Sequence, residues 1–351
     1  MPRGPNEVGW PATQVRVKLV SVRKVNVLSC ELDESIDRAG FRHAGASVGP
    51  RIGADRIGAG VYEAQPGHHT WPYHYHYSTE EWIYVISGAP VLRDSGGERA
   101  LSSGDLVRFP PNHLGAHAMG GPGRFIVFDT HESPGPWVAV YPDSDKISVS
   151  PGALEVSRLN RLRLPRAGAV DYWYGEGSET PSARVEVEHE PVAPSLAVVN
   201  ALALPVEGAP ADAPAGMRSR AATLEPVLGS TWLAATVLEL DPGEGSAPYH
   251  YEPGREEWVL VLTGRPTLRH PDGEDLLQAG DVVCFPEGPA GAHRLVNRGD
   301  RVVRAVFFST TGLPANVCYP DSGTWLMRNG PDREDLVLRE AHAVDQPDRD
   351  V

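Results

Sequence analysis

The chain repeats itself at a fixed distance, and this duplication limits the folds open to it more than any other feature. The segment Pro72 to Trp82, PYHYHYSTEEW, returns 176 positions later as PYHYEPGREEW from Pro248 to Trp258. The match continues without a gap to Gly115-Ala-His117 and Gly291-Ala-His293, and about half of its positions are identical. A gapless match of this length predicts a duplicated domain.

The repeat divides the chain of 351 residues into four parts. We expect an N-terminal domain over residues 23–150, a connector over 151–196, a C-terminal domain over 197–330 and a charged tail over 331–351. Two units of this size agree with the usual length of one domain, roughly 100–200 residues.

Within each repeat the local signals indicate strands. Trp82–Ile86 and Trp258–Leu262 are short apolar runs with β-branched residues, and a Gly follows soon after each run. The chain holds 37 Gly and 33 Pro, which favours many short strands joined by turns. No window shows convincing helical periodicity. The sequence therefore predicts an all-β protein in which each repeat forms a barrel-like domain.

The charge balance excludes some classes of partner. Acidic residues outnumber basic ones by 46 to 32, a net charge of −14, which argues against nucleic acids and anionic membranes as partners. We find no apolar stretch of about 20 residues that could span a membrane and no apolar core of a signal peptide. Three Cys without a CxxC spacing give no disulfide framework. We expect a soluble, cytoplasmic protein.

Histidine and glutamate recur at positions that suggest a metal site. His74 and His76 are two residues apart, so in a strand both side chains leave the same face. Glu81 follows on the next strand and His117 on a later one. Four unrelated polar residues would be the simpler interpretation, but burying them together without a metal is costly, and the pattern recurs in the second repeat. Three imidazoles and one carboxylate predict a divalent transition-metal site.

The second repeat carries a different donor set: His250, Glu252, Glu257 and His293. If Glu252 binds the ion, two carboxylates neutralise its charge, and the site prefers metals such as Mn or Zn. Alternatively the second site is vacant and Glu252 forms a hydrogen bond with His250. Both alternatives stay open at this point.

The motifs Gly67-x6-His-x-His-x4-Glu-x6-Gly88 and Gly104-x5-Pro110…His117 resemble the two signature motifs of the cupin superfamily. The second repeat contains the corresponding pair, from Gly243 to Gly264 and from Gly280 to His293. The chain thus resembles a bicupin. The resemblance implies two tandem jelly-roll β-barrels. It also implies metal-ligand roles for His74, His76, Glu81 and His117 in the first barrel and for His250, Glu257 and His293 in the second.

Three functions fit such a protein. The first, which we favour because many cupins are dioxygenases, is an Fe(II)-dependent oxygenase acting on a small molecule at the N-terminal site. The second is a redox-neutral isomerase, decarboxylase, lyase or cyclase that uses Mn, Zn, Ni or Co. The third is a cupin that binds a small ligand or a metal without catalysis. The fold alone does not choose among them. Exposed sheet edges would also allow a homodimer.

Neighbours of the candidate ligands have simpler roles. Alternation along the strand places Glu80 and Glu256 outside the barrel, where we expect them to support the ligands or to face solvent. Trp82 and Trp258 are expected to pack, and Cys284 is expected to be an inert buried thiol.

Overall fold

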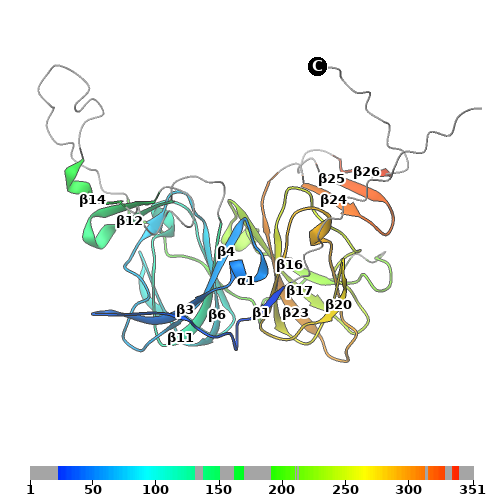
Figure 1. Ribbon diagram of the computed structural model, residues 1–351, viewed down its shortest axis with the longest axis horizontal. Helices are drawn as coiled ribbons and strands as arrows, with labels where there is room; N and C mark the ends of the chain where they lie inside the picture. Colours follow the sequence, from blue (N-terminus) through cyan, green and yellow to red (C-terminus); the bar gives the residue numbers. More distant parts are fainter. Residues whose placement is uncertain are drawn as a thin grey trace, which may run out of the picture.

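The structure is a computed structural model that describes residues 23–130, 137–150, 162–169, 191–209, 211, 213–312, 315–328 and 334–339. It consists of two strand-rich halves that lie side by side (Figure 1). Among the described residues the only α-helices are α1 (Gly49–Ile52) and α3 (Glu225–Leu228), each one turn long. The prediction of an all-β protein is confirmed.

The N-terminal half contains most of the first fourteen strands and three 3-10 turns. Its elements are β2 (Glu34–Arg38), β3 (Phe41–Ser47), β4 (Ile57–Ala64), β5 (Tyr75–His76), β6 (Glu81–Gly88), β7 (Val91–Asp94), β8 (Gly97–Ala100), β9 (Asp105–Phe109), η1 (His113–Gly115), β10 (Ala118–Gly120), β11 (Gly123–Thr130), β12 (Trp137–Tyr141), η2 (Pro142–Ser144), β13 (Lys146–Ser150), β14 (Leu162–Pro165) and η3 (Arg166–Gly168).

The C-terminal half has a similar order of elements but contains fewer of them. Its elements are β16 (Arg220–Thr223), β17 (Leu233–Leu240), β18 (Glu257–Thr263), β19 (Thr267–His270), β20 (Gly273–Leu276), β21 (Asp281–Phe285), η4 (Pro289–Gly291), β22 (Arg294–Val296), β23 (Val303–Thr310), β24 (Ala315–Tyr319), β25 (Thr324–Arg328) and β26 (Leu336–Arg339). Two further strands, β1 (Lys24–Asn26) and β15 (Val198–Asn200), each precede one half.

Each half is an antiparallel jelly-roll barrel built from one large sheet and smaller ones. In the N-terminal barrel the large sheet has the order β15-β9-β6-β11-β4-β3-β2, and in the C-terminal barrel it is β1-β21-β18-β23-β17-β16. The register is equivalent in both: Glu81 pairs with Phe109, and Glu257 pairs with Phe285. The smaller sheets that hold β12 and β14, and β24 to β26, lie on the same side of the molecule, at the top of Figure 1.

The two halves exchange edge strands. β1 precedes the N-terminal barrel but pairs with β21 of the C-terminal one, and β15 precedes the C-terminal barrel but pairs with β9 of the N-terminal one. Both exchanges are fixed in the same way. The Asn26 side chain donates to Asp281, and the Asn200 side chain donates to Asp105, each at 2.9 Å.

A continuous apolar core joins the barrels through the outer faces of their large sheets. It includes Trp82 and Phe128 from one half and Trp258 and Phe308 from the other, all fully buried. The rings of Phe128 and Phe308 lie 4.2 Å apart, and each Trp makes an edge contact with the Phe of the opposite half. The prediction that both Trp residues pack is confirmed. A separate apolar cluster fills the interior of each barrel.

Two segments expected to lie outside the domains contain strands. β14 lies in the predicted connector and pairs with β13, and β26 lies in the predicted charged tail and pairs with β25. The domain boundaries at 150, 196 and 330 stay predictions, because much of the connector lies outside the described residues. No helix among the described residues is long and apolar enough to cross a membrane.

Candidate metal centres

The first candidate site, which we call site one, collects side chains from three parts of the N-terminal barrel. His76 ends β5 and Glu81 begins β6. His74 and His117 lie just outside named strands, where they pair with each other through two main-chain hydrogen bonds of 2.9 and 2.8 Å. All three His side chains are buried. The structure therefore brings together the four residues that the sequence singles out.

Two of these imidazoles are oriented by main-chain carbonyl groups. Nδ1 of His74 lies 2.9 Å from the oxygen of Pro72, and Nδ1 of His117 lies 2.9 Å from the oxygen of Gly115. A carbonyl only accepts hydrogen bonds, so Nδ1 is the protonated nitrogen and Nε2 keeps a free lone pair. Metal-binding histidines are usually fixed in this way. The ring of Phe109 also stacks on His117 at 3.5 Å.

The remaining atoms of site one converge on one point. Oε2 of Glu81 lies 3.2 Å from Nε2 of His76 and 3.7 Å from Nε2 of His117. One donor atom each from His74, His76 and Glu81 all lie within 4.8 Å of one another. Nε2 of His76 and Oε2 of Glu81 are buried and face each other at 3.2 Å without the geometry of a good hydrogen bond, and neither has another hydrogen-bond partner among the described residues. A divalent ion held there would use the lone pair of one ring nitrogen of His76 and one carboxylate oxygen of Glu81.

The electrostatics of site one also suit a cation. Burial, reinforced by the neighbouring His76 and His117, lowers the pKa of His74 to about 3, so its imidazole is neutral at physiological pH. Burial acts to raise the pKa of Glu81, but the three imidazoles outweigh it and hold that pKa far below its usual value. Neutral imidazoles and an ionised carboxylate are the protonation states that metal binding requires.

The second candidate site, which we call site two, consists of His250, Glu257 and His293 in the C-terminal barrel. One donor atom from each lies within 4.8 Å of the others. Their local structure repeats site one: His250 Nδ1 lies 2.8 Å from the oxygen of Pro248, and His293 Nδ1 lies 2.9 Å from the oxygen of Gly291. Phe285 stacks on His293 at 3.7 Å. Site two thus repeats three of the four donors of site one.

The fourth donor differs between the sites. Glu252 stands where site one has His76, but its carboxylate forms an ion pair with Arg255, at 3.3 Å between Oε2 and Nη1. Among the described residues Glu252 forms no hydrogen bond with His250, so the structure does not show the arrangement expected for a vacant site. Sequence reasoning overlooked Arg255. The signal was available, because Thr79 of the first repeat corresponds to Arg255 of the second.

The glutamate of site two is protonated more readily than that of site one. Burial, together with the nearby negative charge of Glu252, raises the pKa of Glu257 to about 8, although Arg255 acts in the opposite direction. Burial also lowers the pKa values of His250 and His293. A metal ion at site two would therefore have to displace a proton from Glu257 at neutral pH.

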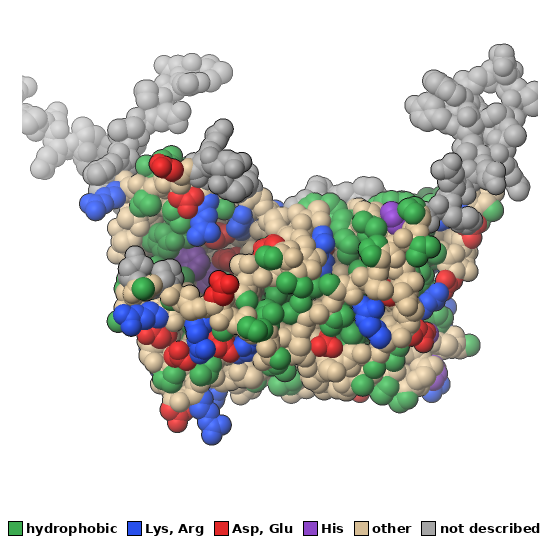
Figure 2. Space-filling view, turned by 180° about the vertical axis from the view of Figure 1, so that it is seen from behind, with side chains coloured by type: hydrophobic (Ala, Val, Ile, Leu, Met, Phe, Trp, Pro, Cys, Tyr) green, Lys and Arg blue, Asp and Glu red, His purple; other side chains and the backbone are tan. Residues whose placement is uncertain are grey.

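Site two differs from site one in solvent exposure mainly at His250. The His250 side chain is 12% exposed, against 3% for His76 and 4% for His117, whereas the glutamates Glu257 and Glu81 are nearly equal at 14% and 15%. In the space-filling view, the C-terminal barrel shows histidine and acidic side chains at the bottom of a hollow (Figure 2).

Glu80 and Glu256 do point away from the barrel interiors, but the expectation that they could face solvent is wrong. Both are buried between the barrels. Each also accepts a hydrogen bond from the indole of the Trp two residues later, Trp82 or Trp258. Cys284 is buried as expected, and burial raises the pKa of its thiol.

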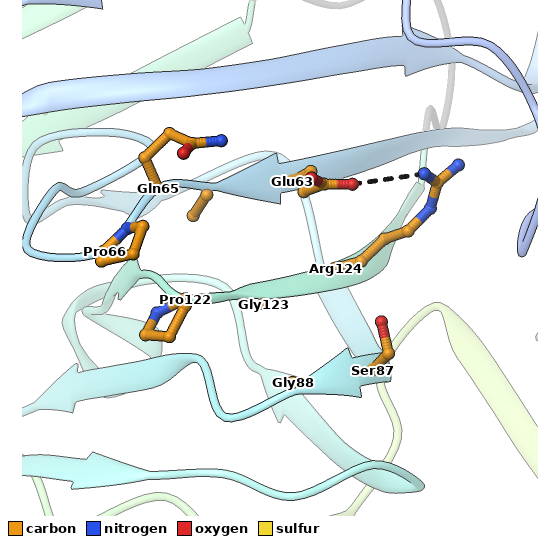
Figure 3. Close-up of a pocket in the computed structure, with 9 residues that line it drawn as sticks. Glu63, Gln65, Pro66, Ser87, Gly88, Pro122, Gly123 and Arg124 are labelled. Carbon is orange, nitrogen blue, oxygen red and sulfur yellow. Dashed lines mark hydrogen bonds and ion pairs between the residues drawn. The ribbon is translucent and has the colours of Figure 1, made fainter.

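A separate cavity of about 290 Å³ lies away from both sites, between β4, β6 and β11 (Figure 3). Its main charged groups, Glu63 and Arg124, form an ion pair. Arg124 also donates to the carbonyl oxygens of Val27 and Cys30, so it holds the segment that follows β1 against the N-terminal barrel. The guanidinium of Arg124 therefore has a structural role.

Comparison with known proteins agrees with this architecture. The model of the cupin domain matches the chain twice, over residues 60–129 and 236–309. A point mutant of oxalate decarboxylase from Bacillus subtilis is a similar solved structure, at 17% sequence identity and a TM-score of 0.47, over 91% of this chain and 80% of that chain. A sugar phosphate isomerase of the cupin superfamily from Silicibacter pomeroyi is similar at 22% identity and a TM-score of 0.35, over 40% of this chain and 91% of that one. No curated protein sequence matches the chain.

Each cupin match falls within one repeat and one barrel, and each contains the glutamate of one candidate site. The chain therefore carries two cupin domains in tandem, one in each barrel.

Proposed function

We propose that this protein is a metal-dependent enzyme that acts on a small organic molecule at site one, in an oxygenase-type reaction with Fe(II). The observation that supports this best is the close approach of the buried Nε2 of His76 and Oε2 of Glu81, 3.2 Å apart without a well-formed hydrogen bond, beside two imidazoles whose Nε2 atoms are left free. In a protein without a metal, burying such poorly paired polar atoms would lower the free energy of unfolding.

His74, His76, Glu81 and His117 would hold the ion. When bound, Fe(II) with open coordination positions supplies redox chemistry with dioxygen, and one carboxylate among three neutral imidazoles leaves positive charge on the ion. The chain supplies the surroundings: the ring of Trp137 lies 4.9 Å from that of His76, and Tyr141 stacks on His74 at 5.8 Å. These rings shield the ligands from water and strengthen electrostatic interactions within the site.

Elemental analysis tests this proposal directly. The protein is purified without chelator and without oxygen, and wild type is compared with His76→Ala and with His68→Ala, a matched loss of a loop histidine outside the site. We expect iron in wild type and in His68→Ala, and its loss in His76→Ala. Oxygen uptake is then measured against a panel of small phenols, diketones and carboxylic acids. Zinc or manganese at site one without oxygen uptake would point to redox-neutral chemistry, and a metal-free wild type would contradict the enzyme proposal.

A further inference from the structure

The two repeats differ at two neighbouring positions of their metal motifs. His76 and Thr79 of the first repeat correspond to Glu252 and Arg255 of the second. The main chain around them is the same: the His76 carbonyl accepts a hydrogen bond from Asn112, and the Glu252 carbonyl accepts one from Gly288, the residue equivalent to Asn112. Glu252 therefore starts from the main-chain position that His76 uses to reach site one.

The side chain of Glu252 nevertheless pairs with Arg255. Nη1 of Arg255 lies 3.3 Å from Oε2 of Glu252, and Nη2 donates to the carbonyl oxygen of Gly312 at 2.6 Å. The second contact anchors the guanidinium to the main chain just after β23. Arg255 can therefore hold Glu252 without moving itself.

This ion pair lies mostly out of solvent. The Glu252 and Arg255 side chains are 13% and 21% exposed, so the pair is screened less than a surface salt bridge. Separating the two partners of a buried ion pair is strongly unfavourable, because it leaves a buried charge without compensation. One donor atom each from His250, Glu257 and His293 lie within 4.8 Å of one another, while the carboxylate of Glu252 pairs with Arg255.

We infer that Arg255 is a positioning residue that keeps Glu252 out of the coordination sphere of site two. The inference rests on the proposed metal-binding function. It makes site two a centre with two imidazoles and one carboxylate, against three imidazoles and one carboxylate at site one. Site two then keeps one more open position and binds a divalent ion more weakly than site one.

The test uses Co(II) as the probe, because its visible absorption reports the number and type of ligands. The reference protein carries His76→Ala and His117→Ala, so that site one is removed and only site two is measured. Three variants are made in it: Arg255→Gln, Glu252→Gln, and both together. Co(II) affinity is measured by competition with a chelator, and circular dichroism checks that each protein is folded.

We expect Arg255→Gln to free Glu252, to tighten Co(II) binding by about tenfold or more, and to change the cobalt spectrum. The double variant has the same net charge as the reference and should return both the affinity, within a few-fold, and the spectrum to the reference.

Several outcomes would overturn the inference. A tenfold weaker affinity in the double variant would mean that Glu252 is already a ligand. Tighter binding in Arg255→Gln with an unchanged spectrum would mean that Arg255 acts only through its charge. A reference protein that binds no Co(II) would show that site two is not a three-ligand centre. In contrast, a wild-type protein that holds no metal at site one would count against the proposed function but not against this inference.

Discussion

Glu80 and Glu256 occupy equivalent positions in the two barrels, and each binds the main chain of the opposite barrel. Glu80 accepts hydrogen bonds from the N–H groups of Thr231 and Trp232, at 2.9 and 2.7 Å. Glu256 accepts three, from residues 55–57, at 2.8 to 3.1 Å. Because each precedes the glutamate of a candidate metal site, the contact between the barrels and the geometry of the sites are built from the same short segment.

The interface glutamates should be important for stability, and Glu80 more so than Glu256. Glu80 also forms a 2.7 Å ion pair with the mostly buried Arg108, whereas the second repeat has Cys284 at that position. Glu80→Gln leaves the charge of this arginine without a carboxylate partner, although its hydrogen bonds to Leu228 and Thr231 remain, so we expect a loss of about 3 kcal/mol in the free energy of unfolding. Glu256→Gln should cost less. Urea denaturation measures both, with the exposed Glu98→Gln as control, and equal losses in the two variants would contradict this reasoning.

Removing a ligand of site one should lower the metal content of the protein but leave it folded. We expect His74→Ala or His117→Ala to lower bound metal by about one equivalent per chain, because each loses an imidazole whose Nε2 is free. Elemental analysis of the folded variants provides the measurement. Unchanged metal content in both variants would show that site one does not bind metal.

The metal-free protein should lose stability when the pH falls below about 6.5. The pKa of His74 is about 3 in the folded chain and near 6.5 in the unfolded chain, so on acidification the unfolded state takes up a proton first. The loss from His74 alone is about 2 kcal/mol by pH 5. His117, His250 and His293 act in the same direction, since burial lowers their pKa values too.

Glu257 opposes this trend and supplies a control. Its pKa of about 8 means that the folded state keeps a proton that the unfolded state loses near pH 4.5, so its contribution to stability grows as the pH falls from 8. Glu257→Gln removes this contribution. Denaturation midpoints between pH 8 and 5 should therefore fall more steeply in the variant than in wild type, and a shallower fall would refute the assignment.

The three free cysteines should differ in reactivity. Cys30 is partly exposed, whereas Cys284 and Cys318 are buried. Burial, together with the nearby negative charge of Glu256, raises the pKa of Cys284 and disfavours its reactive thiolate. A colorimetric thiol reagent should modify one thiol per native chain and three after denaturation. Rapid reaction of two thiols in the native protein would contradict the burial described for Cys284 or Cys318.

Much of the architecture was predictable from the sequence, because a repeat of this length defines the domain and the short β-branched runs define its strands. The strands predicted at Trp82–Ile86 and Trp258–Leu262 lie within β6 and β18. The convergence of His74, His76, Glu81 and His117 also followed from alternation along strands and from the family motifs.

Features that depend on contacts between the halves were not predictable in this way. Alternation shows that Glu80 leaves the barrel, but it cannot show that a second barrel covers that face. The exchange of β1 and β15 likewise leaves no periodic signal, because a strand of three residues is too short for one. The position of the Glu252 carboxylate depends on its ion pair with Arg255. The sequence does not predict this pair, because the long arginine side chain can reach several acceptors.

The exchanged strands also bear on how the protein is made. A ribosome releases Asn26 255 residues before its partner Asp281, and it finishes the N-terminal barrel's own strands well before Asn200 arrives to pair with Asp105. Neither barrel is therefore encoded by one contiguous stretch of chain, and the nascent N-terminal half carries an open sheet edge until the second half has begun to appear. A polypeptide cut in the connector should yield two fragments that each lack a strand, and that regain the native fold only when they are mixed.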